Sequence, residues 1–153
     1  MTAPRTHRAR RTISAPADTL YRSLVEPELL EDWLAPEGAR LKVEHLDAQP
    51  GGAYRFVLNF DSYRGKSGDK TDVVEGRFVA LGPFELVQTE SDFVSDDPAF
   101  AGTMRMSWRF TPVARGTLVE VVAENVPPGI TAEEHEPALA ASLANLARYA
   151  EQP

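Results

Sequence analysis

The stretch TMRMSWRF (residues 103–110) alternates apolar and polar side chains with a period of two. One set comprises Met104, Met106, Trp108 and Phe110, and the other comprises Arg105, Ser107 and Arg109. AYRFVLNF (residues 53–60) repeats the pattern, with Tyr54, Phe56, Leu58 and Phe60 in one set. Clean alternation of this kind is typical of antiparallel strands that bury one face and leave the other in water.

Turn signals divide the chain into short pieces of similar length. Stretches rich in Gly, Pro and Asp lie at 49–52, 63–70, 81–83, 94–102, 113–116 and 126–129. The runs between them, together with 5–13 and 39–47, predict seven strands. Turns this short allow hairpins and leave no room for the crossovers of a parallel sheet.

Three segments have helical spacing instead. Residues 16–25 and 27–34 predict two short helices, and proline stands in the first turn of each. In the last segment Thr131 and Glu134 resemble a capping box, but Pro137 would then lie inside the helix. We expect the long helix to begin near Pro137 and to end near Ala150, because proline is tolerated in a first turn.

These elements predict an α+β fold, in which the last helix crosses the concave face of a curved seven-stranded antiparallel sheet. A helix of about 15 residues spans about 22 Å, whereas a ten-residue strand spans about 33 Å. The helix therefore leaves volume beside it, particularly since Ala138, Ala147 and Ala150 are small. We expect a ligand cavity lined by Trp33, His45, Tyr54, Phe56, Leu58, Phe60, Phe78, Met104, Met106, Trp108, Leu139 and Leu143. The alternative is that the aromatic and methionine side chains of the strands form a plain core.

Trp33 ends a short helix in VEPELLEDWLAP (residues 25–36), between two prolines. It is either a structural plug at the cavity mouth or a ligand contact, and we favour the plug.

Composition narrows the classes of function. The 153 residues predict a single domain, ordered over about 6–151. A net charge of −7 argues against nucleic acid, and the basic cluster of Arg5, Arg8, Arg10 and Arg11 is typical of a protected edge strand. No apolar run is as long as a membrane-spanning helix, which needs about 18 residues. We expect a cytoplasmic monomer or homodimer.

The residues favour no particular chemistry. The chain has no cysteine, and His7, His45 and His135 lack metal-ligand spacing, so we expect neither a metal nor another cofactor. No nucleophile or phosphate-binding motif is present. The polar residues expected to reach the cavity are His45, Gln88, Glu90 and Asn125, with His135 near its end. His45 is interpreted as a core or rim histidine, with a general base as the alternative.

Several motifs together carry a family resemblance over about residues 6–151. They are RRTISAPADTLYRSLVEPELLEDWLAPEG (10–38), DAQPGG (47–52), VEGRFVAL (74–81), FELVQTE (84–90) and SLANLARYAE (142–151). In order and spacing the chain resembles the heat-shock-protein-90 ATPase activator homologue family, of the START-like or SRPBCC superfamily. The resemblance implies the helix-grip fold. It also implies a Gly-Trp pair in the last helix, where this chain has Ala138 and Leu139.

The resemblance implies several kinds of activity. The superfamily holds binders of lipids, sterols and polyketides, and also cyclases and hydrolases that use polar residues in the same cavity. Its eukaryotic namesakes stimulate a chaperone ATPase. We expect a noncatalytic binding module for a small apolar or amphipathic molecule. The alternatives are an enzyme using His45, Glu90 or Tyr54 as acid or base, and a chaperone-activator-like interaction domain.

Overall fold

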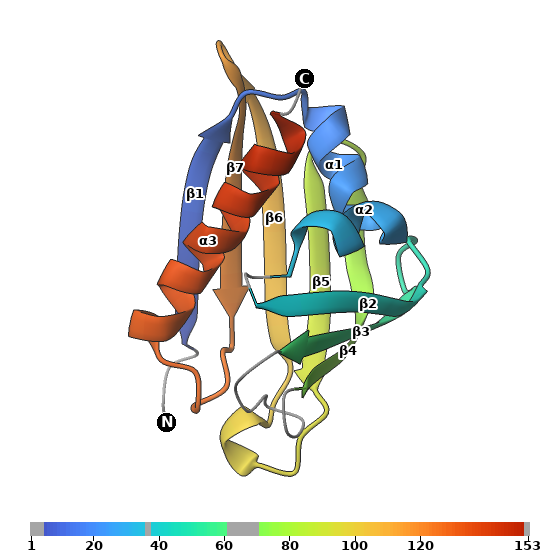
Figure 1. Ribbon diagram of the computed structural model, residues 1–153, viewed down its shortest axis with the longest axis vertical. Coiled ribbons are helices and arrows are strands. Elements are labelled where there is room, and N and C mark those ends of the chain that lie inside the picture. The colour runs from blue at the N-terminus through green and yellow to red at the C-terminus, as the bar shows by residue number, and fades with distance from the viewer. Residues whose placement is uncertain (1–4, 36–37, 61–70, 152–153) are drawn as a thin grey trace.

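The computed structural model describes residues 5–35, 38–60 and 71–151 (Figure 1). Among these residues it shows seven strands, three α-helices and one short 3-10 helix. Their bounds are β1 Thr6–Ile13, α1 Ala17–Val25, α2 Pro27–Trp33, β2 Ala39–Leu46, β3 Ala53–Phe60, β4 Thr71–Gly82, β5 Leu86–Phe93, η1 Pro98–Phe100, β6 Met104–Val113, β7 Gly116–Glu124 and α3 Ala132–Ala150. The predicted turn at 63–70 lies outside the described residues.

The strands form one sheet in the order β1-β7-β6-β5-β4-β3-β2, and every neighbouring pair is antiparallel. Consecutive strands from β2 to β7 are neighbours in the sheet, while α1 and α2 lie in the chain between β1 and β2, which form its two edges. All three helices lie on the same face of the sheet (Figure 1). The structure therefore confirms the predicted α+β helix-grip architecture.

Helix α3 packs mainly on β1, at one edge of the sheet. Leu143, Leu146 and Ala147 are buried there, in the same core cluster as Val119 and Val121 of β7. The three- and four-residue spacing of Leu146 and Ala147 from Leu143 gives the helix one continuous buried face. Because this face lies over the β1 edge, α3 leaves the centre of the sheet uncovered.

Helix α3 begins at Ala132, so the expected start near Pro137 was wrong. The Thr131 hydroxyl accepts a hydrogen bond of 3.2 Å from the Glu134 backbone N–H, and this cap satisfies one of the free donors of the first turn. Pro137 has no backbone N–H to donate to the carbonyl of Glu133, one helical turn earlier. Both residues are exposed, so water can bond to this carbonyl instead. The cap at Thr131 therefore starts the helix at Ala132, and Pro137 is tolerated inside it.

Both edges of the sheet are protected by glutamates from the helices. The backbone N–H of Arg8 on β1 donates to Glu136 of α3 at 3.0 Å, and that of Val43 on β2 donates to Glu31 of α2 at 2.8 Å. A carboxylate on an edge amide occupies a group that would otherwise pair with another strand. The position of β1 also confirms that Arg8, Arg10 and Arg11 of the basic cluster lie on an edge strand, which Arg5 directly precedes. Arg5 is tied down, since its guanidinium donates to the carbonyls of Pro127 and Ile130.

Trp33 is part of the core between α2 and the sheet. Its side chain is 3% exposed, and its indole N–H donates to the Ser23 carbonyl at 2.8 Å. The ring meets Trp108 of β6 edge to face, with centroids 6.0 Å apart. This tryptophan fixes the helical pair α1–α2 against β6.

In the described part of the chain, no helix is long and apolar enough to cross a membrane.

Replacing Trp33 tests this packing. We expect Trp33→Ala to lower the free energy of unfolding by about 3–5 kcal/mol, because it removes a buried ring and leaves a cavity. Trp33→Phe should cost less, since it keeps an aromatic ring and loses the hydrogen bond to Ser23. Urea denaturation of the three proteins measures the difference. A loss below about 1 kcal/mol for Trp33→Ala would show that the indole does not hold the helices in place.

Candidate ligand-binding cavity

A cavity of about 400 Å³ lies between the inner face of strands β3–β6 and helix α3. Leu24, Leu30 and Leu34 of the helical pair α1–α2 close one side of it. On α3 its border is formed by one flank of the helix, which includes Ala138, Ala141, Ser142 and Asn145. The cavity lies beside α3 because the helix packs mainly on β1, at the edge of the sheet.

Nine of the twelve side chains predicted to line the cavity border it in the structure. They are Tyr54, Phe56, Leu58, Phe60, Phe78, Met104, Met106, Trp108 and Leu139. Eight of them lie on strands, where alternation places every second side chain on the same face. The inner face of the sheet could therefore be identified from the sequence pattern, and the pairings of β3 to β6 bring its members together.

Three of the twelve lie elsewhere, and two of them are in the core. Trp33 packs edge to face against Trp108 and does not border the cavity, and Leu143 is 1% exposed in the contact between α3 and the sheet. Ala147, expected to leave empty volume, is likewise part of that core. Leu143, Leu146 and Ala147 of α3 pack at the edge of the sheet, and the neighbouring flank of the helix borders the cavity.

His45 is exposed, contrary to the prediction that it shares a face with Leu41 and Val43. The register between β2 and β3 shifts between Val43 and His45, so Val43 pairs with Phe56 but His45 pairs with Arg55. Such a bulge inserts an extra residue and reverses the alternation beyond it. His45 therefore does not border the cavity.

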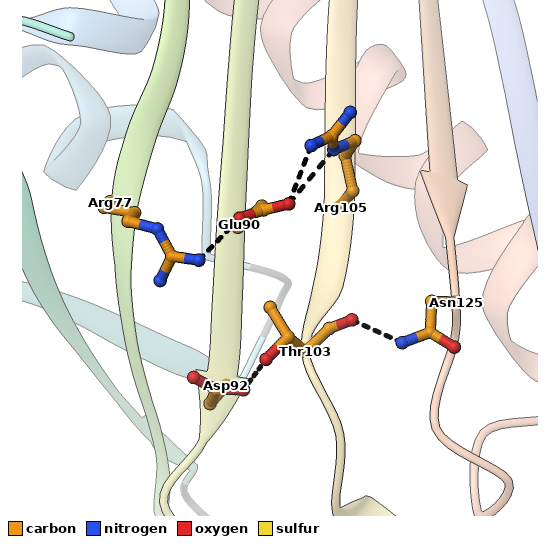
Figure 2. Close-up of polar contacts among 6 residues, drawn as sticks. All are labelled: Arg77, Glu90, Asp92, Thr103, Arg105 and Asn125. Atoms are coloured by element: carbon orange, nitrogen blue, oxygen red, sulfur yellow. Dashed lines mark hydrogen bonds and ion pairs between the residues drawn. The ribbon is translucent and has the colours of Figure 1, made fainter. Parts of the chain in front are cut away.

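Three of the remaining polar residues expected at the cavity, Gln88, Glu90 and Asn125, do not border it. Figure 2 shows the contacts of Glu90 and Asn125. Glu90 of β5 lies between Arg77 of β4, at 2.6 Å, and Arg105 of β6, at 2.8 Å. Asn125 donates to the Thr103 carbonyl at 2.7 Å. Gln88 donates to the Ser107 hydroxyl at 3.0 Å on the same outer face. Of this group, His135 alone borders the cavity, as predicted.

The two arginines change the acidity of Glu90. Hydrogen bonding to Arg105, followed by the charges of Arg105 and Arg77, lowers the pKa of the Glu90 carboxyl below its usual 4.5. A lowered pKa in the folded state means that the ionised carboxylate stabilises the fold. This contribution is complete above the unfolded pKa and is lost as the pH falls through the folded value.

Glu90→Gln should therefore lower the free energy of unfolding at pH 7. The gap from the parent protein should narrow as the pH falls below about 4.5, because the parent carboxylate then takes up a proton. Denaturant titrations between pH 3 and pH 7 measure the gap. A gap that stays constant over this range would contradict the ion-pair account.

Two hydroxyl residues on the cavity wall, Thr89 and Ser91, were not predicted from the sequence, and both lie beside the predicted Tyr54. Tyr54 lies across the sheet over Gly76, which has no side chain to block it, and its hydroxyl meets Thr89 and Ser91 of β5. Tyr54 is 6% exposed and Ser91 5% exposed. Burial raises the pKa of the Tyr54 phenol, while hydrogen bonding with Thr89 and Ser91 acts in the opposite direction. The phenol therefore keeps its proton at neutral pH.

Gly76→Ala tests the placement of Tyr54. A methyl group at position 76 would lie 2.5 Å from the Tyr54 hydroxyl oxygen and 2.6 Å from its ring, and it would also meet the Glu90 carbonyl. We expect a loss of at least about 1–3 kcal/mol in the free energy of unfolding.

Gly82→Ala on the same strand is the matched control, since its nearest neighbour would be at an ordinary 3.7 Å. Equal stability of the two variants in urea would contradict the placement of Tyr54.

The topology brings together two histidines that are distant in sequence. His7 of β1 is 4% exposed, and its Nδ1 lies 2.8 Å from Nδ1 of His135 on α3. At this distance one nitrogen donates and the other accepts, so the pair ties the edge strand to the helix beside the cavity. Within residues 5–35, 38–60 and 71–151 no three His, Asp or Glu side chains gather in a way that could hold a metal ion.

Comparison with known proteins places this architecture in a family. Residues 14–151 match the family described as activator of Hsp90 ATPase homolog 1-like protein. The chain belongs to this family. Its fold is of a type that serves as a ligand-binding or activator module. No curated protein matches the sequence.

Solved structures of bacterial proteins share the fold over nearly the whole chain. Protein CV1439 from Chromobacterium violaceum is 30% identical, with a TM-score of 0.87 over 97% of this chain and 98% of that one. Protein NE0264 from Nitrosomonas europaea is 21% identical, with a TM-score of 0.76 over 96% and 94%. The AHSA1-like protein from Aeromonas hydrophila is 15% identical, with a TM-score of 0.76 over 96% and 92%. These likenesses extend the family assignment to the fold.

Proposed function

We propose that the chain is a noncatalytic binding module that holds one small apolar or amphipathic molecule in the cavity between α3 and the sheet. The observation that carries the proposal is the cavity itself, with a volume of about 400 Å³ and a wall rich in aromatic, methionine and leucine side chains. Small-molecule sites in proteins usually measure about 300–1,000 Å³ and have such walls.

The α3 flank supplies an entrance. Ala138 and Ala141 border the cavity and are exposed, while Ser142 and Asn145 beside them are half-buried. Small side chains along one flank leave a way in that does not require the core face of the helix to move. Leu139 stands where the family resemblance implies a tryptophan, and it leaves volume that an indole would fill.

The polar groups support binding over catalysis. Of the three residues weighed as acid or base, His45 is exposed and Glu90 is paired with arginines on the outer face. Tyr54 borders the cavity, but its raised pKa keeps the phenol protonated at neutral pH. A protonated phenol is suited to hydrogen bonding with a ligand and is a poor general base.

Blocking the entrance tests the proposal. We expect the parent protein to bind the uncharged dye N-phenyl-1-naphthylamine, with the rise in fluorescence that apolar surroundings cause. Ala141→Trp should weaken dye binding by about tenfold or more, because the indole covers or enters the cavity border.

Ala140→Trp is the matched control, since Ala140 is exposed on the same helix and does not border the cavity. Both substitutions are at exposed positions and should change the free energy of unfolding by no more than about 0.5 kcal/mol. Absence of dye binding to the parent protein, or equal affinity in the two variants, would contradict the binding module.

A further inference from the structure

Three hydroxyl groups meet at one place on an otherwise largely apolar cavity wall. Tyr54 of β3 reaches across Gly76 to Thr89 and Ser91 of β5, and all three side chains border the cavity. We call Tyr54, Thr89 and Ser91 the hydroxyl cluster. Its surroundings are aromatic, since the Tyr54 ring packs against Phe56 with centroids 4.6 Å apart and against Phe78 at 5.5 Å.

The hydroxyl cluster has hydrogen-bonding capacity beyond its internal contacts. Each of its hydroxyls carries one hydrogen and two lone pairs. Hydrogen bonds between the Tyr54 hydroxyl and each of Thr89 and Ser91 would use two of the three hydrogens and two of the six lone pairs, so one hydrogen and four lone pairs would remain. A ligand group that both donates and accepts can use what is left, and a hydroxyl is the simplest such group.

Charge around the cavity disfavours an ionised ligand group at this place. The described lining residues include no lysine or arginine, and the His135 ring is engaged with His7, so a buried anion would find no permanently charged partner among them. The one lining carboxylate, Asp72, is 3% exposed and already takes part in an interaction of its own. A neutral group avoids the desolvation cost that either sign of charge would incur.

We propose that the cavity selects an uncharged ligand that places a hydroxyl on the Tyr54–Thr89–Ser91 cluster and its apolar body against the neighbouring aromatic and methionine side chains. The inference rests on the proposed binding function and adds the chemical class of the ligand. Gly76 is a positioning residue in this account, because its missing side chain lets the Tyr54 ring lie flat and brings the phenol to β5.

Three probes of one shape separate the contributions of the body and the polar group. Naphthalene, 2-naphthol and 2-naphthoate share a ring system and differ in carrying no polar group, a neutral hydroxyl or an anion. Their dissociation constants at pH 7 are measured by displacement of N-phenyl-1-naphthylamine. We expect 2-naphthol to bind about tenfold tighter than naphthalene, although naphthalene is the more apolar, and at least about tenfold tighter than 2-naphthoate.

Substitutions in the hydroxyl cluster should then remove the preference. In Tyr54→Phe and in Ser91→Ala we expect the advantage of 2-naphthol over naphthalene to fall about threefold to tenfold, while naphthalene binding persists. The controls are Tyr21→Phe, whose ring contacts Phe84 and Phe110 away from the cavity, and Ser107→Ala on the outer face. Both should retain the parent preference.

The possible failures are distinguishable. Naphthalene or 2-naphthoate binding as tightly as 2-naphthol would overturn the ligand class and leave the binding module standing. A preference for 2-naphthol over naphthalene that persists in both Tyr54→Phe and Ser91→Ala would likewise overturn the ligand class and leave the binding module standing. Failure of the parent protein to bind the dye and all three probes would overturn the binding module and this inference with it.

Discussion

The packing of α3 against the edge strand β1 determines where everything else in this fold can lie. Leu143, Leu146 and Ala147 bury the helix beside β7, and the His7–His135 pair fastens it to β1. An apolar face that is committed to the edge cannot also cover the middle of the sheet. The inner face of β3–β6 therefore stays open on that side, and the helical pair α1–α2 closes it on another. The cavity follows from this division of the inner face.

The chemistry of the cavity depends on one glycine in the middle of a strand. A side chain at position 76 would occupy the space of the Tyr54 ring, and the phenol could then not reach Thr89 and Ser91. Glycine inside a strand lowers its intrinsic stability, and its presence often marks the close approach of another group. Here the approaching group is a tyrosine whose polar end supplies hydrogen bonding to a wall that is otherwise mostly apolar.

Much of the fold could be predicted from the sequence because alternation and turn residues are local signals. TMRMSWRF and AYRFVLNF each identify their inner face, and the structure places Met104, Met106, Tyr54 and Phe56 on it. Strand β5 gave no such guidance, since Leu86 and Val87 are both apolar and alternation alone does not decide which face they occupy. Glu90 was therefore assigned to the cavity, and Thr89 and Ser91 were missed.

Other features depend on contacts that no local pattern contains. The bulge after Val43 reverses the direction of His45, and it can be recognised only from the pairing of β2 with β3. The contact between His7 and His135 joins residues 128 positions apart. The cap at Thr131 was visible in the sequence, but whether it outweighs Pro137 depends on the exposure of the proline.

The central claim is that a molecule occupies the space between α3 and the sheet, and methionine methyl groups report on that space directly. Met104 and Met106 both border the cavity, and the chain has only three methionines, so methyl-labelled methionine gives a simple NMR spectrum. On titration with N-phenyl-1-naphthylamine, the account predicts that the Met104 and Met106 signals shift together and saturate at one dye per chain. Signals that stay in place while the dye binds would show that it sits elsewhere, and would contradict the account.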